Sequence, residues 1–204
     1  MSTSQDEKKK VVLERVTPES LKLYAPRLAA ILCRQITHQN RSINFLNPFS
    51  TSQAIEIFEN ASSSLTKSGA GRKIMWVAKL PSSETDTALK SLDMDGKETD
   101  HSEIVGTVQL AFHFSPNGVH RTEVGKLIVD DRYERRGIAR TLMDELHRTA
   151  KEQGSTLCLL DTEAGYAEHF YSKLGWKLSG YVPGYAMTPD GKEKRDAAFM
   201  YLEL

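Results

Sequence analysis

Three arginines and a glycine lie within one short turn of the sequence. Arg135, Arg136 and Arg140 flank Gly137, and the residues that follow have helical spacing. The first turn of a helix exposes unpaired backbone N–H groups and a partial positive charge, and a glycine lets a ligand approach the backbone closely. With the arginines added, this turn predicts an anion site that suits a diphosphate.

The turn does not match the common phosphate-binding sequences. The chain contains neither G-x-x-x-x-G-K-[ST] nor G-x-G-x-x-G. An ordinary helix start with exposed arginines would look the same, so the turn alone slightly favours that simpler interpretation. The residues before and after it change the balance.

Two segments together resemble the GNAT superfamily of N-acetyltransferases. The cofactor motif of that family, [QR]-x-x-G-x-[GA] after an apolar strand, stands here as ERRGIA at residues 134–139. A second signature, aromatic-Tyr-x-x-Leu-Gly-aromatic after an alanine, stands here as FYSKLGW at residues 170–176. The two occur in the family's order and at its distance, which makes the pair more specific than either one.

Two positions depart from the family pattern. Glu134 stands where the family usually has Gln or Arg, and we expect its side chain to turn away because a carboxylate beside a diphosphate is unfavourable. Ala164 stands where many members have Asn, which puts one side-chain contact to the cofactor in doubt.

Within the superfamily, the chain is most similar to the tabtoxin-resistance acetyltransferases. The similarity runs through residues 15–20, 121–127, 160–165 and 183–191. It implies acetyl transfer to an amine of a small molecule, such as an amino-acid-like toxin or antibiotic, in detoxification or resistance. The reaction class is better supported than the acceptor, because proteins that share a fold and its motifs often act on different substrates. A protein N-acetyltransferase and a non-catalytic acyl-CoA-binding module are the alternatives.

The resemblance implies acetyl-CoA as the cofactor and assigns its contacts. The backbone of Leu127, Ile128 and Val129 is expected to lie alongside the pantetheine arm and to supply an oxyanion donor. The remaining cofactor contacts are expected at Arg135, Arg136, Gly137, Ile138, Ala139, Arg140, Phe170 and Lys173.

Acetyl transfer to an amine needs an acid and a base. Tyr171 is the candidate acid, since a phenol of pKa about 10 is protonated at neutral pH and the family places this Tyr beside the cofactor sulfur. Glu123 and Asp161, at strand positions, are equal candidates for the base that takes the amine proton. The acceptor is expected to meet Asn44, Phe45 and Tyr185.

The surrounding pattern predicts an α/β chain with the GNAT fold. We expect a mixed, mostly antiparallel sheet of about six to seven strands with helices on both faces. A helix should begin at Thr17 and be bent or split by Pro26, and Asn117-Gly118 should turn a hairpin. Residues 1–10 are interpreted as a flexible tail and residues 81–102 as a disordered insertion in a single domain at 11–204.

Bulk composition limits the classes of function. The formal net charge is +0, so the basic excess of a nucleic-acid binder is missing. The two cysteines cannot build a disulfide framework, and no metal-ligand spacing occurs, so no metal is expected. Without a signal-like start or an apolar run of about 20 residues, we expect a cytoplasmic protein with no membrane partner, either a monomer or a homodimer.

Overall fold

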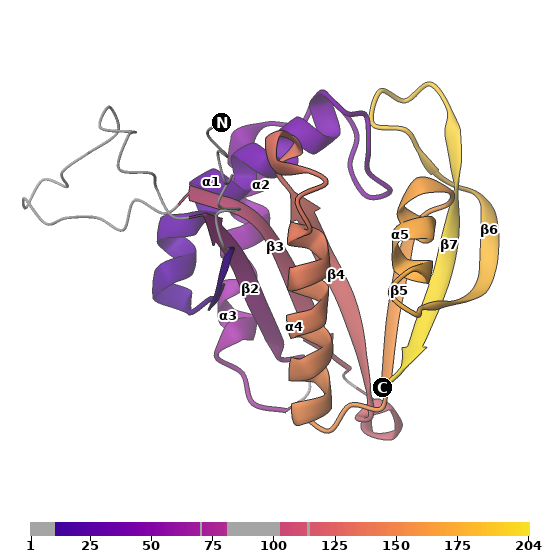
Figure 1. Cartoon of the computed structure of the whole chain (residues 1–204). Coiled ribbons are helices and arrows are strands. Elements are labelled where there is room, and N and C mark those ends of the chain that lie inside the picture. The colour runs from indigo at the N-terminus through magenta and orange to yellow at the C-terminus, as the bar shows by residue number, and fades with distance from the viewer. Residues whose placement is uncertain (1–10, 70, 81–102, 114) are drawn as a thin grey trace, which may run out of the picture.

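The computed structural model describes residues 11–69, 71–80, 103–113 and 115–204, and its strands form one seven-stranded sheet (Figure 1). The expected tail at 1–10 and the expected insertion at 81–102 lie outside these residues. The strands are β1 (Val12–Arg15), β2 (Lys73–Leu80), β3 (Glu103–Phe112), β4 (Arg121–Val129), β5 (Leu157–Glu163), β6 (Lys177–Met187) and β7 (Lys194–Glu203). The helices are α1 (Pro18–Thr37), α2 (Thr51–Glu59), α3 (Ser62–Leu65), α4 (Ile138–Glu152) and α5 (Tyr166–Ser172).

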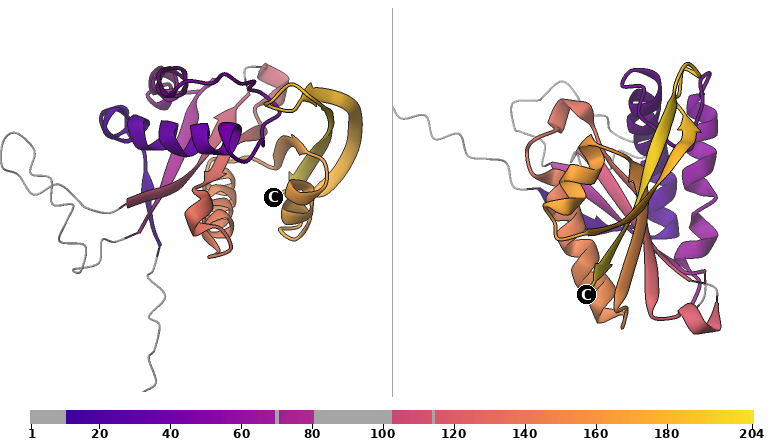
Figure 2. Two further views of the ribbon diagram at one scale, coloured as in Figure 1. Left: turned by 90° about the horizontal axis from the view of Figure 1, so that it is seen from above. Right: turned by 90° about the vertical axis from the view of Figure 1, so that its right-hand side faces the viewer.

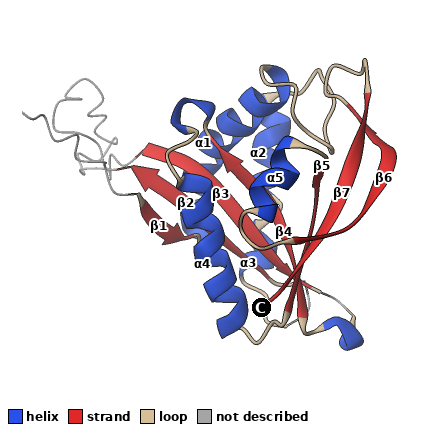
Figure 3. Ribbon diagram, turned by 45° about the vertical axis from the view of Figure 1, so that its right-hand side comes forward, coloured by secondary structure: helices blue, strands red, loops and turns tan. Residues whose placement is uncertain are grey.

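The sheet has the order β1-β2-β3-β4-β5-β7-β6, and its neighbours are antiparallel except for β4 and β5. These two parallel strands pair only where Arg121–Glu123 lie beside Leu157–Leu159, and beyond that point they diverge (Figure 3). The expected α/β fold with a mixed, mostly antiparallel sheet and helices on both faces is therefore confirmed. The divergence leaves an opening in the middle of the sheet.

Helices cover both faces of the sheet (Figure 2). α4 packs on β2, β3 and β4, and its expected apolar stripe is buried, with Ile138, Leu142, Leu146 and Ala150 all in the core. α5 lies on the same face against β5. On the opposite face, α1 packs on β3 and β4 and buries Leu21, Leu28, Ile31 and Ile36.

Pro26 does not split α1. Thr17 and Ser20 form a reciprocal capping box, Pro18 occupies the first turn, and the helix continues through Pro26 to Thr37. An internal proline costs about 3 kcal/mol. The apolar face buried on the sheet offsets that cost, so the expectation of a split helix was wrong.

The C-terminal strands are longer than the sequence indicates. Residues 183–185 lie within β6, where the pairing with β7 shifts and Gly184 has φ 62°. Most β6 side chains are exposed, so the strand lacks an alternating apolar pattern and is fixed by its pairing with β7. At Asn117-Gly118, a short 3-10 turn over Pro116–Gly118 joins β3 and β4 in place of a two-residue turn.

Among the helices that the structure describes, none is long and apolar enough to cross a membrane.

Candidate active site

Two cavities lie beside the opening between β4 and β5. One, of ≈ 420 Å³, is bordered by the end of β4, the start of α4, α5 and the end of α1; we call it the arginine cavity. The other, of ≈ 610 Å³, lies along β5 and β7; we call it the carboxylate cavity. Each takes residues from elements that are distant in the sequence.

The arginine cavity collects nearly all of the expected cofactor contacts. Of those residues, only Arg136 is absent from its wall: the Arg136 guanidinium lies 5.2 Å from the centre of the Tyr133 ring. The wall contains Leu127, Ile128, Val129, Arg135, Gly137, Ile138, Ala139, Arg140, Phe170, Tyr171 and Lys173, together with Gln35, Gln39, Arg41, Tyr133, Glu134 and Ala167.

A bulge shapes the β4 side of this cavity. Opposite β3, Ile128 pairs with Thr107 but Gly125 pairs with Gln109, so one extra residue is accommodated on β4. Lys126, within the bulge, has φ 52°. Since the pairing of β4 with β5 ends at Glu123, the backbone of Leu127–Val129 has no strand partner on that side. It is thus available to hydrogen-bond an extended ligand.

The start of α4 forms the opposite wall. Gly137 has φ 83°, no side chain caps the helix, and the first helical bond within it runs from the Thr141 N–H to the Gly137 carbonyl. A Cβ placed on Gly137 would have nothing within 4 Å, so the approach to this turn is open. The unpaired N–H groups of the first turn, beside Arg135 and Arg140, fit the phosphates of a nucleotide cofactor.

Ion pairs between α1 and the turn before α4 were not predicted. Arg34 makes a two-pronged contact to Asp131, with Nε–Oδ1 at 2.9 Å and Nη2–Oδ2 at 2.7 Å. Arg27 donates to the buried Asp130 carboxylate, and Arg41 lies 3.5 Å from Glu134. The only sequence signal was the seven-residue spacing of the three arginines, which puts Arg27 and Arg34 near one face of α1; Arg41 lies beyond the end of that helix.

Asp130 remains ionised within this contact. Burial on its own would raise the pKa of Asp130, but hydrogen bonds from the side chain and backbone of Arg132, and from Arg27, outweigh it and bring the pKa far below its usual value. The carboxylate accepts from Arg132 Nε at 3.0 Å and Nη2 at 2.8 Å. This network fixes the turn that leads into α4.

Tyr171 lines the arginine cavity and is almost fully buried. It is 9% exposed and packs edge-on against Phe170 and Trp176, with ring centroids 5.2 Å and 6.0 Å away. Burial, and then the negative charge of Asp161, raise the pKa of Tyr171 well above its usual value. The phenol is therefore protonated at neutral pH. The charge that acts on it belongs to Asp161, which lies in the other cavity.

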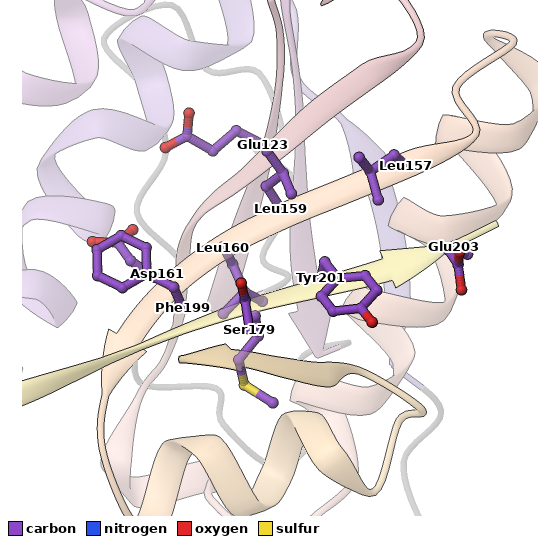
Figure 4. Close-up of a pocket in the computed structure, with 10 residues that line it drawn as sticks. Glu123, Leu157, Leu159, Leu160, Asp161, Ser179, Phe199, Tyr201 and Glu203 are labelled. Carbon is purple, nitrogen blue, oxygen red and sulfur yellow. The ribbon is translucent and has the colours of Figure 1, made fainter. Parts of the chain in front are cut away.

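The carboxylate cavity has a different character (Figure 4). Glu123 and Asp161 lie toward one end and Glu203 toward the other, and no basic residue lines it. Its wall also contains Leu157, Leu159, Leu160, Ser179, Phe199, Met200 and Tyr201. Glu203 is neutralised by Lys177 at 2.6 Å, whereas Glu123 and Asp161 make no ion pair within the described part of the chain. This surface suits a cation with an apolar body.

The three expected acceptor contacts lie outside both cavity walls. Tyr185 packs edge-on against Phe199, with ring centroids 5.7 Å apart, so it borders the carboxylate cavity indirectly. Phe45 packs against Phe49, and the Lys126 ammonium lies 4.9 Å from the centre of its ring. Asn44 is exposed, and its backbone N–H donates to Ser42 Oγ at 3.0 Å.

These segments from the two ends of the chain meet directly. The backbone N–H of Asn47 donates to the Pro189 carbonyl at 2.7 Å, and the N–H of Asp190 donates to Asn40 Oδ1 at 3.0 Å. The loop after α1 and the turn between β6 and β7 therefore come together.

Within the residues described, no group of three or more His, Cys, Asp or Glu side chains is placed to hold a metal ion.

Comparison with known proteins finds a matching family model and several solved structures with a similar fold. Residues 97–178 match the family model described as an acetyltransferase (GNAT) domain. The fold resembles an N-acetyltransferase from Staphylococcus aureus Mu50 (TM-score 0.67, 17% identity, 95% of this chain and 98% of the other). It also resembles a putative acetyltransferase from Salmonella typhimurium with its cofactor acetyl-CoA (TM-score 0.64, 14% identity, 96% of this chain and 94% of the other). A third similar structure is a putative phosphinothricin N-acetyltransferase (TM-score 0.65, 17% identity, 96% of this chain and 99% of the other).

Proposed function

We propose that this chain, which has the GNAT fold and carries a GNAT acetyltransferase domain match, transfers the acetyl group of acetyl-CoA to the amine of a small molecule. The observation that carries this proposal is that strand β4 borders two cavities of opposite chemistry. Leu127–Val129 line a cavity with arginines and free backbone N–H groups, and Glu123 lines a cavity with carboxylates and apolar side chains.

The arginine cavity suits the cofactor. Its β4 wall offers unpaired backbone groups for the amides of the pantetheine arm, and the α4 turn offers N–H groups, Arg135 and Arg140 for the diphosphate. When bound there, acetyl-CoA supplies a thioester whose carbonyl carbon an amine can attack. The backbone N–H groups of β4 then supply donors for the negative charge that develops on the carbonyl oxygen.

The carboxylate cavity suits the amine. An alkyl amine has a pKa of about 10.4, so it arrives as a cation and must lose a proton before it can attack. Carboxylates without cationic partners attract the ammonium, and one of them takes the proton, directly or through water. We favour Asp161 over Glu123, because Asp161 lies beyond the last β4–β5 pair and its charge reaches Tyr171.

Tyr171 completes the exchange as the acid. The new bond forms between the amine nitrogen and the acetyl carbon, and the carbon–sulfur bond breaks. The ammonium gives one proton to Asp161 before attack. As the amide forms, the nitrogen loses a second proton, which replaces the one that the Tyr171 hydroxyl donates to the departing thiolate. The raised pKa of Tyr171 ensures that this proton is present.

The size and lining of the carboxylate cavity favour a small acceptor. Its ≈ 610 Å³ lies within the range of about 300–1,000 Å³ typical of small-molecule sites. Leu157, Leu159 and Phe199 provide apolar contact for the body of such an amine. An amino-acid-like toxin or antibiotic, the acceptor class implied by the sequence resemblance, stays a prediction.

A direct test measures thiol release from acetyl-CoA against a panel of aryl- and alkylamines, amino acids, amine-bearing antibiotics and short peptides. We expect release with one or more small amines. Cofactor binding without release on any amine would overturn the enzymatic proposal and favour an acyl-CoA-binding module. Release only with peptides would move the acceptor to proteins.

A further inference from the structure

Glu134 poses a problem for the arginine cavity. It lines the cavity beside Arg135 and Gly137, where the phosphates of the cofactor are expected. A carboxylate this close to a phosphate repels it electrostatically. The turn therefore carries a charge that opposes its own ligand.

Arg41 lies against this carboxylate. Its Nη1 atom is 3.5 Å from Glu134 Oε1, and Arg41 also lines the arginine cavity. It belongs to the segment just after α1, distant in the sequence from the turn. Arg41 therefore brings a positive charge next to the negative charge of Glu134.

Fold stability does not account for this pair. The two side chains are 48% and 38% exposed, and exposed ion pairs typically contribute little to stability. Arg27 and Arg34 of α1 are better placed to hold the turn, since Asp130 is fully buried and Arg34 contacts Asp131 at two points. A contribution to the ligand site explains the position of Arg41 better.

A second observation indicates that this end of α1 faces a ligand. Gln35 lines the same cavity, and its Oε1 atom is buried without a hydrogen-bond donor in the described residues. A buried acceptor without a donor is unfavourable, because it has lost its hydrogen bonds to water without replacing them. An N–H group of the pantetheine arm is the kind of donor that would satisfy it.

We propose that Arg41 is a positioning residue for the cofactor, which cancels the charge of Glu134 and so allows the α4 turn to accept a diphosphate. The proposal rests on acetyl-CoA as the ligand of this cavity. Arg41 acts through Glu134, and it brings a cation to this turn from another part of the chain. Neutralising Glu134 should therefore make Arg41 dispensable.

The test is a double-mutant cycle read by calorimetric binding of coenzyme A and of pantetheine, which lacks the phosphates. Arg41→Ala should raise the Kd for coenzyme A about tenfold and leave the Kd for pantetheine within about twofold. Arg41→Ala combined with Glu134→Gln should return the coenzyme A Kd to within about twofold of the wild-type value. Glu134→Gln alone should leave it unchanged or lower.

Arg148→Ala is the matched control, because Arg148 is an exposed arginine of α4 with carboxylate partners away from both cavities. An unchanged Kd in Arg41→Ala would overturn the proposal, as would a double variant as weak as Arg41→Ala, which would mean that Arg41 binds the diphosphate itself. Failure of the wild-type protein to bind coenzyme A would instead overturn the proposed function.

Discussion

The arginine cavity and the carboxylate cavity share one opening in the sheet but are built in opposite ways. The arginine cavity has walls from four elements, and its turn pairs with Arg27 and Arg34 of α1 and with Arg41 of the segment after α1. The carboxylate cavity lies mainly along β5 and β7, with apolar side chains between carboxylates. A charged, constant ligand needs a fixed anion site, whereas an apolar surface with a few carboxylates can accept various amines.

Tyr171 lines the arginine cavity and is reached by the charge of Asp161 from the carboxylate cavity, so its loss should have the largest effect. Tyr171→Phe should lower turnover about 10³-fold, because no other phenol can replace it as the acid. Among the described residues, the other tyrosine of the arginine cavity is Tyr133, and its hydroxyl donates to Glu103. The Kd for acetyl-CoA should change less than about twofold. Thiol release and calorimetry measure the two quantities.

The control for this variant is Tyr201→Phe, which removes a hydroxyl from the far end of the carboxylate cavity. Because the pKa of Tyr171 is raised, wild-type turnover should show no alkaline loss below about pH 10. Unaltered turnover in Tyr171→Phe would show that the thiolate leaves without this acid.

The two carboxylates test the other side of the opening. Asp161→Asn should lower kcat about 10²-fold, less than the loss at Tyr171 because Glu123 can partly replace the base. Glu123→Gln should lower kcat by less than about tenfold, with most of its effect on the KM of the amine. Steady-state kinetics at saturating acetyl-CoA separate the two. The reverse order would assign the base to Glu123.

The arginines around the α4 turn should differ in how much each contributes to the binding of coenzyme A. Arg140→Ala should raise the Kd for coenzyme A about tenfold and reduce the dependence of binding on salt, since Arg140 lines the cavity. Arg136→Ala should change the Kd by about twofold, since Arg136 lies over the Tyr133 ring outside the wall. Equal effects in calorimetry at two salt concentrations would contradict this division.

The smallest effect concerns the backbone of the turn. Gly137→Ala should lower the free energy of unfolding by about 1 kcal/mol, because its φ of 83° strains any residue with a Cβ. Gly125→Ala is the control, since Gly125 has neither a positive φ nor a neighbour within 4 Å of an added Cβ. Urea unfolding measures both, and equal losses would mean that the turn relaxes.

The sequence by itself determined the features that depend on neighbouring residues. The apolar stripe of α4, the open glycine at its start and the Tyr171 segment are local patterns, and the structure places them where the motifs predicted. Helical periodicity and glycine conformation act over a few residues, so a linear pattern is enough to predict them.

Only the tertiary structure decided which distant side chains meet. The contacts of Arg27, Arg34 and Arg41 with the turn, the continuation of α1 through Pro26 and the length of β6 depend on packing and strand pairing. The opposite charges of the two cavities depend in turn on where β4 and β5 separate. Long-range contacts form only when the chain folds as a whole, because no local pattern specifies a partner about a hundred residues away.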